Sequence, residues 1–254
     1  SVGMSAGGKH PKAIIAIDWS TGEIRSGQIL LPESFTQYIL KFKDSETWPT
    51  AEIEYVYYQM ATECGIDMEK SSLLHVSGAN HFLTERFDRK HGRKQHSATL
   101  RSLCGEITSY DDIFRACRLL RLPYRGMEQL FRRAVFNYLA GVTDDHDKNF
   151  SFLMDKQGRW SLAPAYDMVY SIDPNTLGIQ KGQFMSIKGK VLDITEKDLL
   201  AMARENDINN PSGIISQVLD VVSNFRSYCE GVDVNSSTCD IMQKELNEKY
   251  KSFK

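Results

Sequence analysis

The chain has 254 residues and a mass of 28.9 kDa, enough for one large domain or for two small lobes that share a cleft. Hydrophobic residues make up 41% of it and charged residues 25%, as in an ordinary soluble globular protein. A net charge of −2 and a pI near 6.3 exclude the basic surface expected of a protein that binds nucleic acid or an anionic membrane directly. No apolar run approaches the roughly 20 residues that cross a bilayer.

The cysteines indicate a reducing compartment. Their number, five, is odd, and no two have the C-x-x-C spacing of a zinc or redox site. Free thiols in a reducing cytoplasm are the simplest interpretation. The N-terminal residues also lack the basic and apolar segments of a secretory signal. We therefore expect a cytoplasmic protein that makes no membrane contact.

Residues 1–88 are predicted to form a small lobe of mixed strands and helix. Four strands are expected, at 13–18, 24–31, 38–42 and 81–87. A helix is expected from 51 to 64, because Ile53, Val56 and Met60 recur at helical spacing behind Thr50, a candidate N-cap.

Residues 89–254 are predicted to form a larger, mostly helical lobe. Helices are expected at 109–122, 126–140, 199–204, 210–227 and 237–251. A capping box at Thr195–Asp198 marks the start of the helix expected at 199–204. Asp155–Gly158 predicts a hairpin turn between short strands at 149–153 and 160–162.

The segment 141–150, Gly-Val-Thr-Asp-Asp-His-Asp-Lys-Asn-Phe, concentrates polar residues between an apolar helix and this hairpin. Asp144 and Asn149 stand five positions apart, as in the kinase catalytic loop, where the aspartate accepts the proton of the substrate hydroxyl and the asparagine binds metal. Taken alone, the segment is equally compatible with a solvated polar loop.

A further carboxylate, Asp167, stands eighteen residues after Asn149. In kinases an aspartate in this place binds metal. The alternative is that Tyr166 and Asp167 only end a strand. Because a short hairpin would return Asp167 to the side of Asn149, both side chains could reach one cation, which favours the metal site.

Two segments of the small lobe are suited to a nucleotide. The Gly-rich stretch 3–12 precedes a strand and could approach phosphate closely, although it does not match the P-loop pattern and a flexible terminus is the alternative. Lys41 in a strand and Glu54 in the following helix resemble the lysine–glutamate pair that holds ATP phosphates. A surface lysine and an unrelated glutamate are the alternative.

Together these segments resemble the signature of HipA-like serine/threonine kinases, the toxins of HipA–HipB toxin–antitoxin pairs. The stretches 143–150 and 162–167 carry most of the likeness. Segments 7–13, 85–89 and 185–190 agree with the Gly-rich loop, the hinge and a strand of the helical lobe of that family. The likeness runs from residue 1 to about 205. It implies an α+β, two-lobed, protein-kinase-like fold that uses ATP and Mg²⁺.

The resemblance also implies roles for individual residues. Asp144 would be the catalytic base, Asn149 and Asp167 would hold Mg²⁺, and His146 and Lys148 would orient the loop and the phosphates. The implied nucleotide-binding residues are Ser5, Gly7, Gly8, Lys12, Lys41, Glu85 and Phe87.

Within that set, Lys41 would contact the α- and β-phosphates, and the backbone around Glu85 and Phe87 would hold adenine. Ser5 corresponds to the loop serine whose autophosphorylation switches these kinases off.

The implied partners are a protein substrate, for which an aminoacyl-tRNA synthetase is the family precedent, and a helix-turn-helix antitoxin of the HipB type. DNA would be bound only through the antitoxin. Full HipA proteins carry a further N-terminal region, which would here be a separate small protein or lie outside the given sequence. Two alternatives stay open: a small-molecule phosphotransferase of the same fold, and a non-catalytic nucleotide-binding subunit of a repressor complex.

Overall fold

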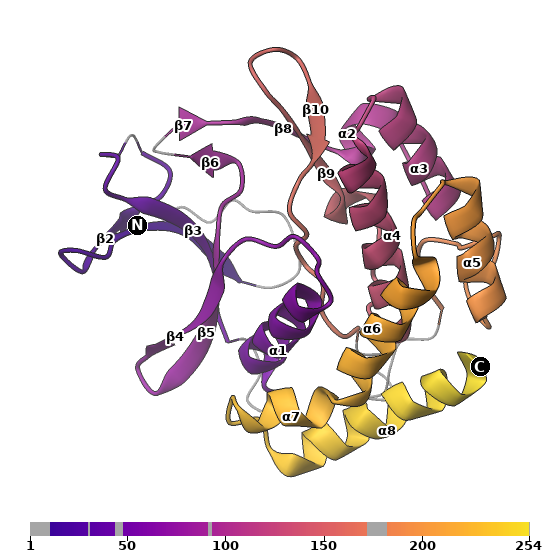
Figure 1. Cartoon of the computed structure of the whole chain (residues 1–254). Helices are drawn as coiled ribbons and strands as arrows, with labels where there is room; N and C mark the ends of the chain where they lie inside the picture. The colour runs from indigo at the N-terminus through magenta and orange to yellow at the C-terminus, as the bar shows by residue number, and fades with distance from the viewer. Residues whose placement is uncertain (1–10, 30, 44–47, 91–92, 172–181, 254) are drawn as a thin grey trace. The chain divides into compact units, whose positions relative to one another are not determined.

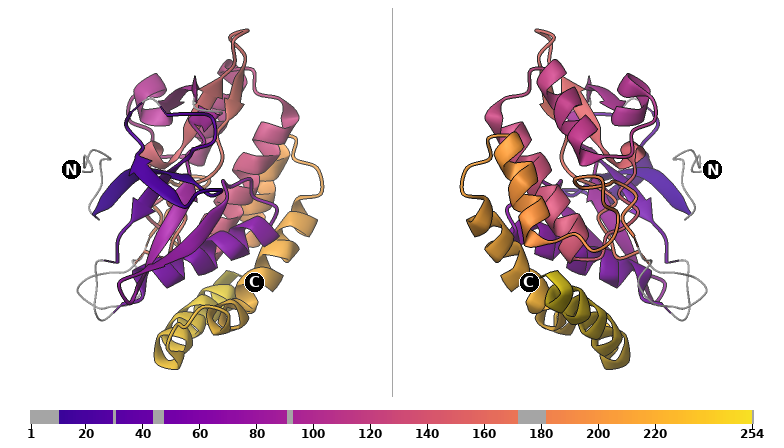
Figure 2. Two further views of the ribbon diagram at one scale, coloured as in Figure 1. Left: turned by 90° about the vertical axis from the view of Figure 1, so that its left-hand side faces the viewer. Right: turned by 90° about the vertical axis from the view of Figure 1, so that its right-hand side faces the viewer.

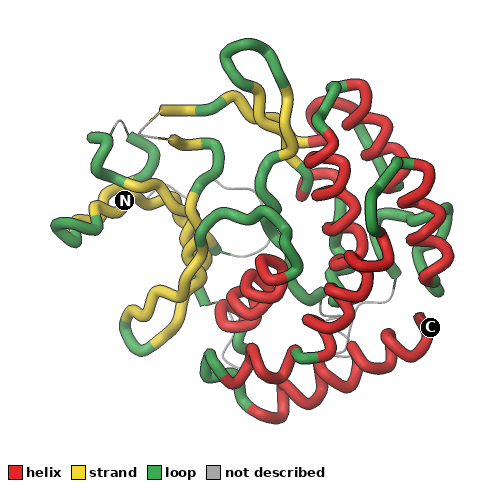
Figure 3. Tube along the Cα trace, viewed as in Figure 1, coloured by secondary structure: helices red, strands yellow, loops and turns green. Residues whose placement is uncertain are grey.

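The computed structural model describes residues 11–29, 31–43, 48–90, 93–171 and 182–253. The chain forms two compact units. Unit 1 comprises residues 1–55 and 69–96, and unit 2 comprises residues 56–68 and 97–254, so the division passes through the helix α1 (Thr50–Glu63). Figure 3 shows that unit 1 is built mainly from strands and unit 2 mainly from helices. The lobe limits expected from the sequence, 1–88 and 89–254, stay a prediction.

Unit 1 contains a five-stranded antiparallel sheet with the order β2-β1-β3-β5-β4 (Figure 1). Its strands are β1 (Lys12–Asp18), β2 (Glu23–Ser26), β3 (Thr36–Lys41), β4 (Ser71–Val76) and β5 (Ala79–Glu85). A two-stranded ladder, β6 (Arg89–Lys90) and β7 (Arg93–Lys94), follows it. The four strands predicted from the sequence are confirmed, although β2 ends at Ser26, five residues earlier than expected. The edge strand β4 was not predicted.

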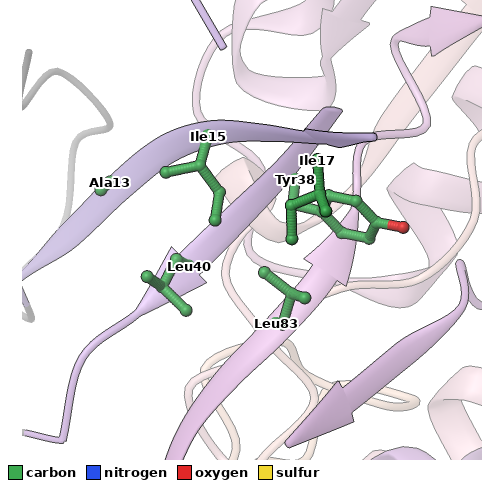
Figure 4. Close-up of a cluster of buried hydrophobic side chains, with 6 residues drawn as sticks. All are labelled: Ala13, Ile15, Ile17, Tyr38, Leu40 and Leu83. Atoms are coloured by element: carbon green, nitrogen blue, oxygen red, sulfur yellow. The ribbon is translucent and has the colours of Figure 1, made fainter. Parts of the chain in front are cut away.

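The core of this sheet is a small apolar cluster, shown in Figure 4. It consists of Ala13, Ile15, Ile17, Tyr38, Leu40 and Leu83. The members on β1 and β3 are two positions apart along their strands, because alternate side chains of a strand point to the same face. The register of Leu40 opposite Leu83 brings β5 into the same cluster.

Unit 2 is organised around α4, which is buried along most of its length and contacts α3, α6 and α8. The helices of this unit are the second half of α1, α2 (Leu100–Cys104), α3 (Tyr110–Leu119), α4 (Tyr124–Leu139), α5 (Glu196–Glu205), α6 (Pro211–Ser223), α7 (Phe225–Glu230) and α8 (Ser236–Phe253). In both views of Figure 2, α7 and α8 lie together at one end of the helical unit. None of the helices in the described ranges is long and apolar enough to cross a membrane.

A short sheet in unit 2 carries the predicted hairpin. Its order is β10-β9-β8, with β8 at His96–Thr99, β9 at Ser151–Met154 and β10 at Trp160–Leu162. The turn at Asp155–Gly158 is confirmed: the Asp155 carboxylate accepts the N–H groups of Gln157 and Arg159, and Gly158 has a φ of 76°. Glycine adopts this left-handed conformation without steric cost.

Other predictions from the sequence had mixed outcomes. The capping box is confirmed, because the Asp198 carboxylate accepts the Thr195 N–H at 2.8 Å. The helix expected at 210–227 is interrupted at Asn224, where α6 ends and α7 begins. Thr50 does not act as a cap, since its hydroxyl makes no hydrogen bond. Residues 185–190 form isolated bridges in place of the expected strand.

We predict that Leu83→Ala destabilises unit 1 by about 2–5 kcal/mol, because it removes a side chain that is only 1% exposed and leaves a cavity in the apolar cluster. The free energy of unfolding in urea measures the effect. Ile24→Ala is the matched control, because Ile24 lies on β2 of the same sheet and is 57% exposed. Equal losses in the two variants would contradict a core at Leu83.

Candidate active site

The loop after α4 presents its side chains alternately outward and inward. Asp144 and Lys148 are exposed, whereas Asp145 and Asp147 are buried. The Asp144 side chain is 67% exposed and that of Asp147 only 1%. The sequence does not distinguish these three aspartates by type, so the structure alone shows which carboxylate is available to a substrate.

Asp145 anchors the loop to the interior of unit 2. Its carboxylate accepts the Tyr110 hydroxyl at 2.7 Å, the Met185 N–H at 3.1 Å and the Gln183 amide at 3.3 Å. Burial raises the pKa of Asp145 to about 6, although these hydrogen bonds act in the opposite direction. The Tyr110 hydroxyl is itself an acceptor for the Asn137 amide of α4, so a connected polar network fixes the residue next to Asp144.

Asp147 anchors the loop a second time. Its carboxylate accepts the Ile107 N–H at 3.0 Å and forms an ion pair with Arg101 of α2 at 2.8 Å. The ion pair and the hydrogen bond offset the cost of burying this carboxylate. Neither Asp145 nor Asp147 was assigned a role from the sequence, because such anchors are not distinguishable from exposed carboxylates without the fold.

The exposed Asp144 is flanked by two side chains of its own loop. The Asn149 amide donates to the Asp144 carbonyl at 3.0 Å, so the side-chain oxygen of Asn149 is the atom available to a cation. His146 Nδ1 accepts the Lys148 N–H at 3.2 Å. The proton of a neutral ring therefore lies on Nε2, which is 3.9 Å from Asp144 Oδ1.

Asp167 shares a small pocket with Asn149. The pocket lies wholly in unit 2, and other residues that line it include Arg133, Asn137, Asp145 and Tyr166. Asp167 has a φ of 53°, a left-handed conformation that aspartate tolerates better than most residues. The adjacent Tyr166 joins this segment to the loop at 141–150, because its hydroxyl donates to the Lys148 carbonyl at 2.7 Å and is 2.6 Å from the Ser151 hydroxyl.

Ser171 forms a second tie between these segments. Its hydroxyl oxygen accepts the N–H groups of Thr143 at 3.0 Å and of Asp144 at 3.1 Å. Its own N–H donates to the Gly141 carbonyl at 3.2 Å. The stretch from Asp167 to Ser171 thus carries one candidate metal ligand and also holds the backbone of the candidate base. No sequence signal pointed to Ser171.

In unit 1, Lys41 forms an ion pair with Glu54, and both side chains are largely buried. Lys12 lies directly opposite Lys41 in the register of β1 and β3, so the two lysine side chains emerge on the same face of the sheet. Glu85 ends β5, and its N–H donates to the Lys70 carbonyl at 3.0 Å.

The expected hinge continues past β5. Phe87 stands between Arg86 and Asp88, whose side chains form a bidentate pair at 2.8 Å. Ser5, Gly7 and Gly8 lie outside the described residues.

The family model of the HipA-like C-terminal domain matches residues 4–226. The chain belongs to this family. The resemblance predicted from the sequence is therefore confirmed, and the HipA-like domain occupies most of the chain.

Two curated relatives of this HipA-like chain are named as kinases. "Putative kinase" of Haemophilus influenzae is 33% identical over 159 residues, which cover 54% of this chain and 46% of the relative. "Putative kinase Y4mE" of Sinorhizobium fredii is 28% identical over 164 residues, which cover 58% and 39%. The matched part therefore spans less than half the length of each relative.

Solved structures confirm the predicted α+β, kinase-like fold. HipA of Shewanella oneidensis, solved with HipB and operator DNA, superposes with a TM-score of 0.73 at 19% identity, over 98% of this chain and 65% of the other. The proinflammatory kinase CtkA of Helicobacter pylori gives a TM-score of 0.61 at 13% identity, over 98% and 90%.

We predict that Asp145 makes this HipA-like domain less stable as the pH rises from about 4 to about 6. The folded state holds the proton of Asp145 up to about pH 6 and the unfolded state only up to about pH 4, so stability falls through this window. Relative to Asp145→Asn, the wild-type free energy of unfolding should fall by up to about 3 kcal/mol between pH 4 and pH 7. Urea unfolding at several pH values measures it, and a constant difference between the two proteins would contradict the prediction.

Proposed function

We propose that this chain is an ATP- and Mg²⁺-dependent serine/threonine protein kinase of the HipA type. The observation that carries the proposal is the arrangement in unit 2: Asn149 and Asp167 line one pocket, and the exposed Asp144 is hydrogen-bonded through its backbone to Asn149. Membership of the HipA-like family and the names of the curated relatives support a phosphotransferase.

The pocket is suited to a magnesium ion. Mg²⁺ prefers hard oxygen ligands and usually takes one or two from the protein and the rest from water and phosphate. Asp167 offers a carboxylate and Asn149 an amide oxygen, which is a donor set of this kind. A magnesium ion held there would offset the negative charge that accumulates on the transferred phosphoryl group.

Asp144 is the candidate base for the substrate hydroxyl. Phosphoryl transfer requires an acceptor for the hydroxyl proton, placed in line with the phosphate. The Asp144 carboxylate is exposed, while its own N–H is held by Ser171 and its carbonyl by Asn149. It therefore combines access to a protein substrate with a fixed backbone. His146, 3.9 Å away, would orient it, and Lys148 would meet the phosphates.

Unit 1 would contribute the contacts to the nucleotide. Lys12 and Lys41 project from the same face of the sheet, and like charges placed directly opposite each other repel unless an anion lies near them. The phosphates of ATP would offset this repulsion, while Glu54 holds Lys41 in position. Adenine would bind the backbone near Glu85 and Phe87. Gly7 and Gly8, which lie outside the described residues, would belong to the phosphate-binding segment.

We propose partners by analogy with the relatives. Because the Shewanella HipA was solved with HipB and operator DNA, we propose a helix-turn-helix partner of the HipB type, with DNA bound only through it. The protein substrate would belong to the translation machinery, an aminoacyl-tRNA synthetase being the family precedent. The kinase would act in the cytoplasm.

We predict that Asp144→Asn lowers phosphoryl transfer from ATP by about 100-fold or more, because the amide cannot accept the hydroxyl proton. Incubation with labelled ATP and Mg²⁺ measures it, with Ser5 as the expected site of self-labelling. Nucleotide affinity should be unchanged.

Asp220→Asn, an exposed position on α6, is the matched control for this change. Equal labelling by the Asp144→Asn variant would refute the assigned base. A wild-type chain that binds ATP without transferring phosphate would favour the non-catalytic alternative.

We predict that Asp167→Asn raises the Mg²⁺ concentration needed for half-maximal transfer by about tenfold or more, because a carboxylate ligand is replaced by a neutral amide. Asparagine tolerates the left-handed backbone, so the fold should be preserved.

Asp207→Asn is the control for this second change, because Asp207 is exposed and has the same φ of 53°. An unchanged Mg²⁺ requirement in Asp167→Asn would argue against Asp167 as a ligand.

A further inference from the structure

The C-terminal helix α8 carries two charged residues on its packing face. The buried members of that face are Met242, Leu246 and Phe253, at helical spacing. Glu245 stands three residues after Met242, and Lys249 stands three residues after Leu246. Both charged side chains are only partly exposed. Residues that only pack a helix would be apolar, so these two charges call for another explanation. The helix also lies beyond residues 4–226, the part that the family model matches.

Glu245 accepts a hydrogen bond from the hydroxyl of Tyr170. Tyr170 is three residues after Asp167 and directly precedes Ser171, whose hydroxyl accepts the N–H of Asp144. The Tyr170 ring is buried against Tyr57, with 6.5 Å between the ring centroids. A buried tyrosine hydroxyl needs a polar partner, and Glu245 of α8 is that partner. The contact lies within residues 167–171, the stretch that runs from the candidate metal ligand Asp167 to Ser171, which holds the candidate base.

Lys249, one turn further along α8, contacts the end of α4. Its ammonium lies 4.5 Å from the centroid of the Tyr138 ring. This contact accounts for the second charge on the packing face and joins α8 to the helix that precedes the loop at 141–150.

We propose that α8 positions the two catalytic segments of this kinase through the hydrogen bond of Tyr170 to Glu245. Glu245 and Tyr170 are positioning residues, because neither lines the pocket of Asn149 and Asp167. The proposal rests on the kinase activity proposed above. It predicts that the loss of this hydrogen bond moves Asp144 out of line and lowers the rate of transfer, while ATP still binds.

The experiment compares Glu245→Gln, Tyr170→Phe and the double variant in the full chain. Each single change should lower kcat about tenfold, the effect typical of losing a hydrogen bond to a charged group that fixes geometry, and should leave the KM for ATP unchanged. The double variant should be no slower than either single variant, because both remove the same bond.

Glu248→Gln and Lys244→Met are the controls, since both residues are exposed on α8. Hydrogen exchange provides a readout that does not depend on catalysis: amides at 143–145 and 167–171 should exchange faster in the Glu245 and Tyr170 variants and not in the controls. If Glu245→Gln does not fold, Tyr170→Phe tests the same bond.

Wild-type kcat together with unchanged exchange in these variants would overturn the proposal. If the wild-type chain itself transfers no phosphate, the kinase assignment fails separately. The link from α8 to the loop is then judged on exchange alone, where faster exchange supports it and unchanged exchange overturns it.

Discussion

The carboxylate of Asp145 is buried and accepts hydrogen bonds from the Tyr110 hydroxyl and the Met185 amide, and the conformation of the loop around it follows from this anchor. Asp145 is turned inward, and its neighbour Asp144 faces outward. Asp147 repeats the pattern through Arg101. Two buried carboxylates thus fix a loop whose exposed residues are the ones suited to chemistry. Asp145 is held by hydrogen bonds from neutral groups, and Asp147 by an ion pair with Arg101.

Local sequence patterns predicted the parts of this arrangement that depend on neighbouring residues. Asp155–Gly158 specified a hairpin, and a hairpin of that length returns the chain to its starting point, so Asn149 and Asp167 line one pocket as their spacing suggested. The Thr195 capping box was visible for the same reason, since its bonds form within one turn. The pairing of Lys41 with Glu54 needed only the order of a strand and a helix.

The remaining features depend on contacts between distant segments, which one sequence does not reveal. Ser171 holds the amide of Asp144 across 27 residues, and nothing in its neighbourhood distinguishes it from any loop serine. Whether Asp144 or Asp145 faces solvent is decided by Tyr110 and Met185, 35 and 40 residues away from Asp145. The strand β4 was missed because it is an edge strand with a half-exposed face, and such strands carry little apolar periodicity.

The left-handed backbone at Asp167 has an evolutionary consequence. Of the common residues, glycine, asparagine and aspartate adopt this conformation most easily, and the aspartate codons differ from those of asparagine and glycine by one base. A single mutation can therefore remove the charge of Asp167 and leave the fold intact. If Asp167 holds metal as proposed, one base change is enough to remove that ligand from a chain that keeps its architecture, and residue 167 is the position at which such a descendant would be recognised.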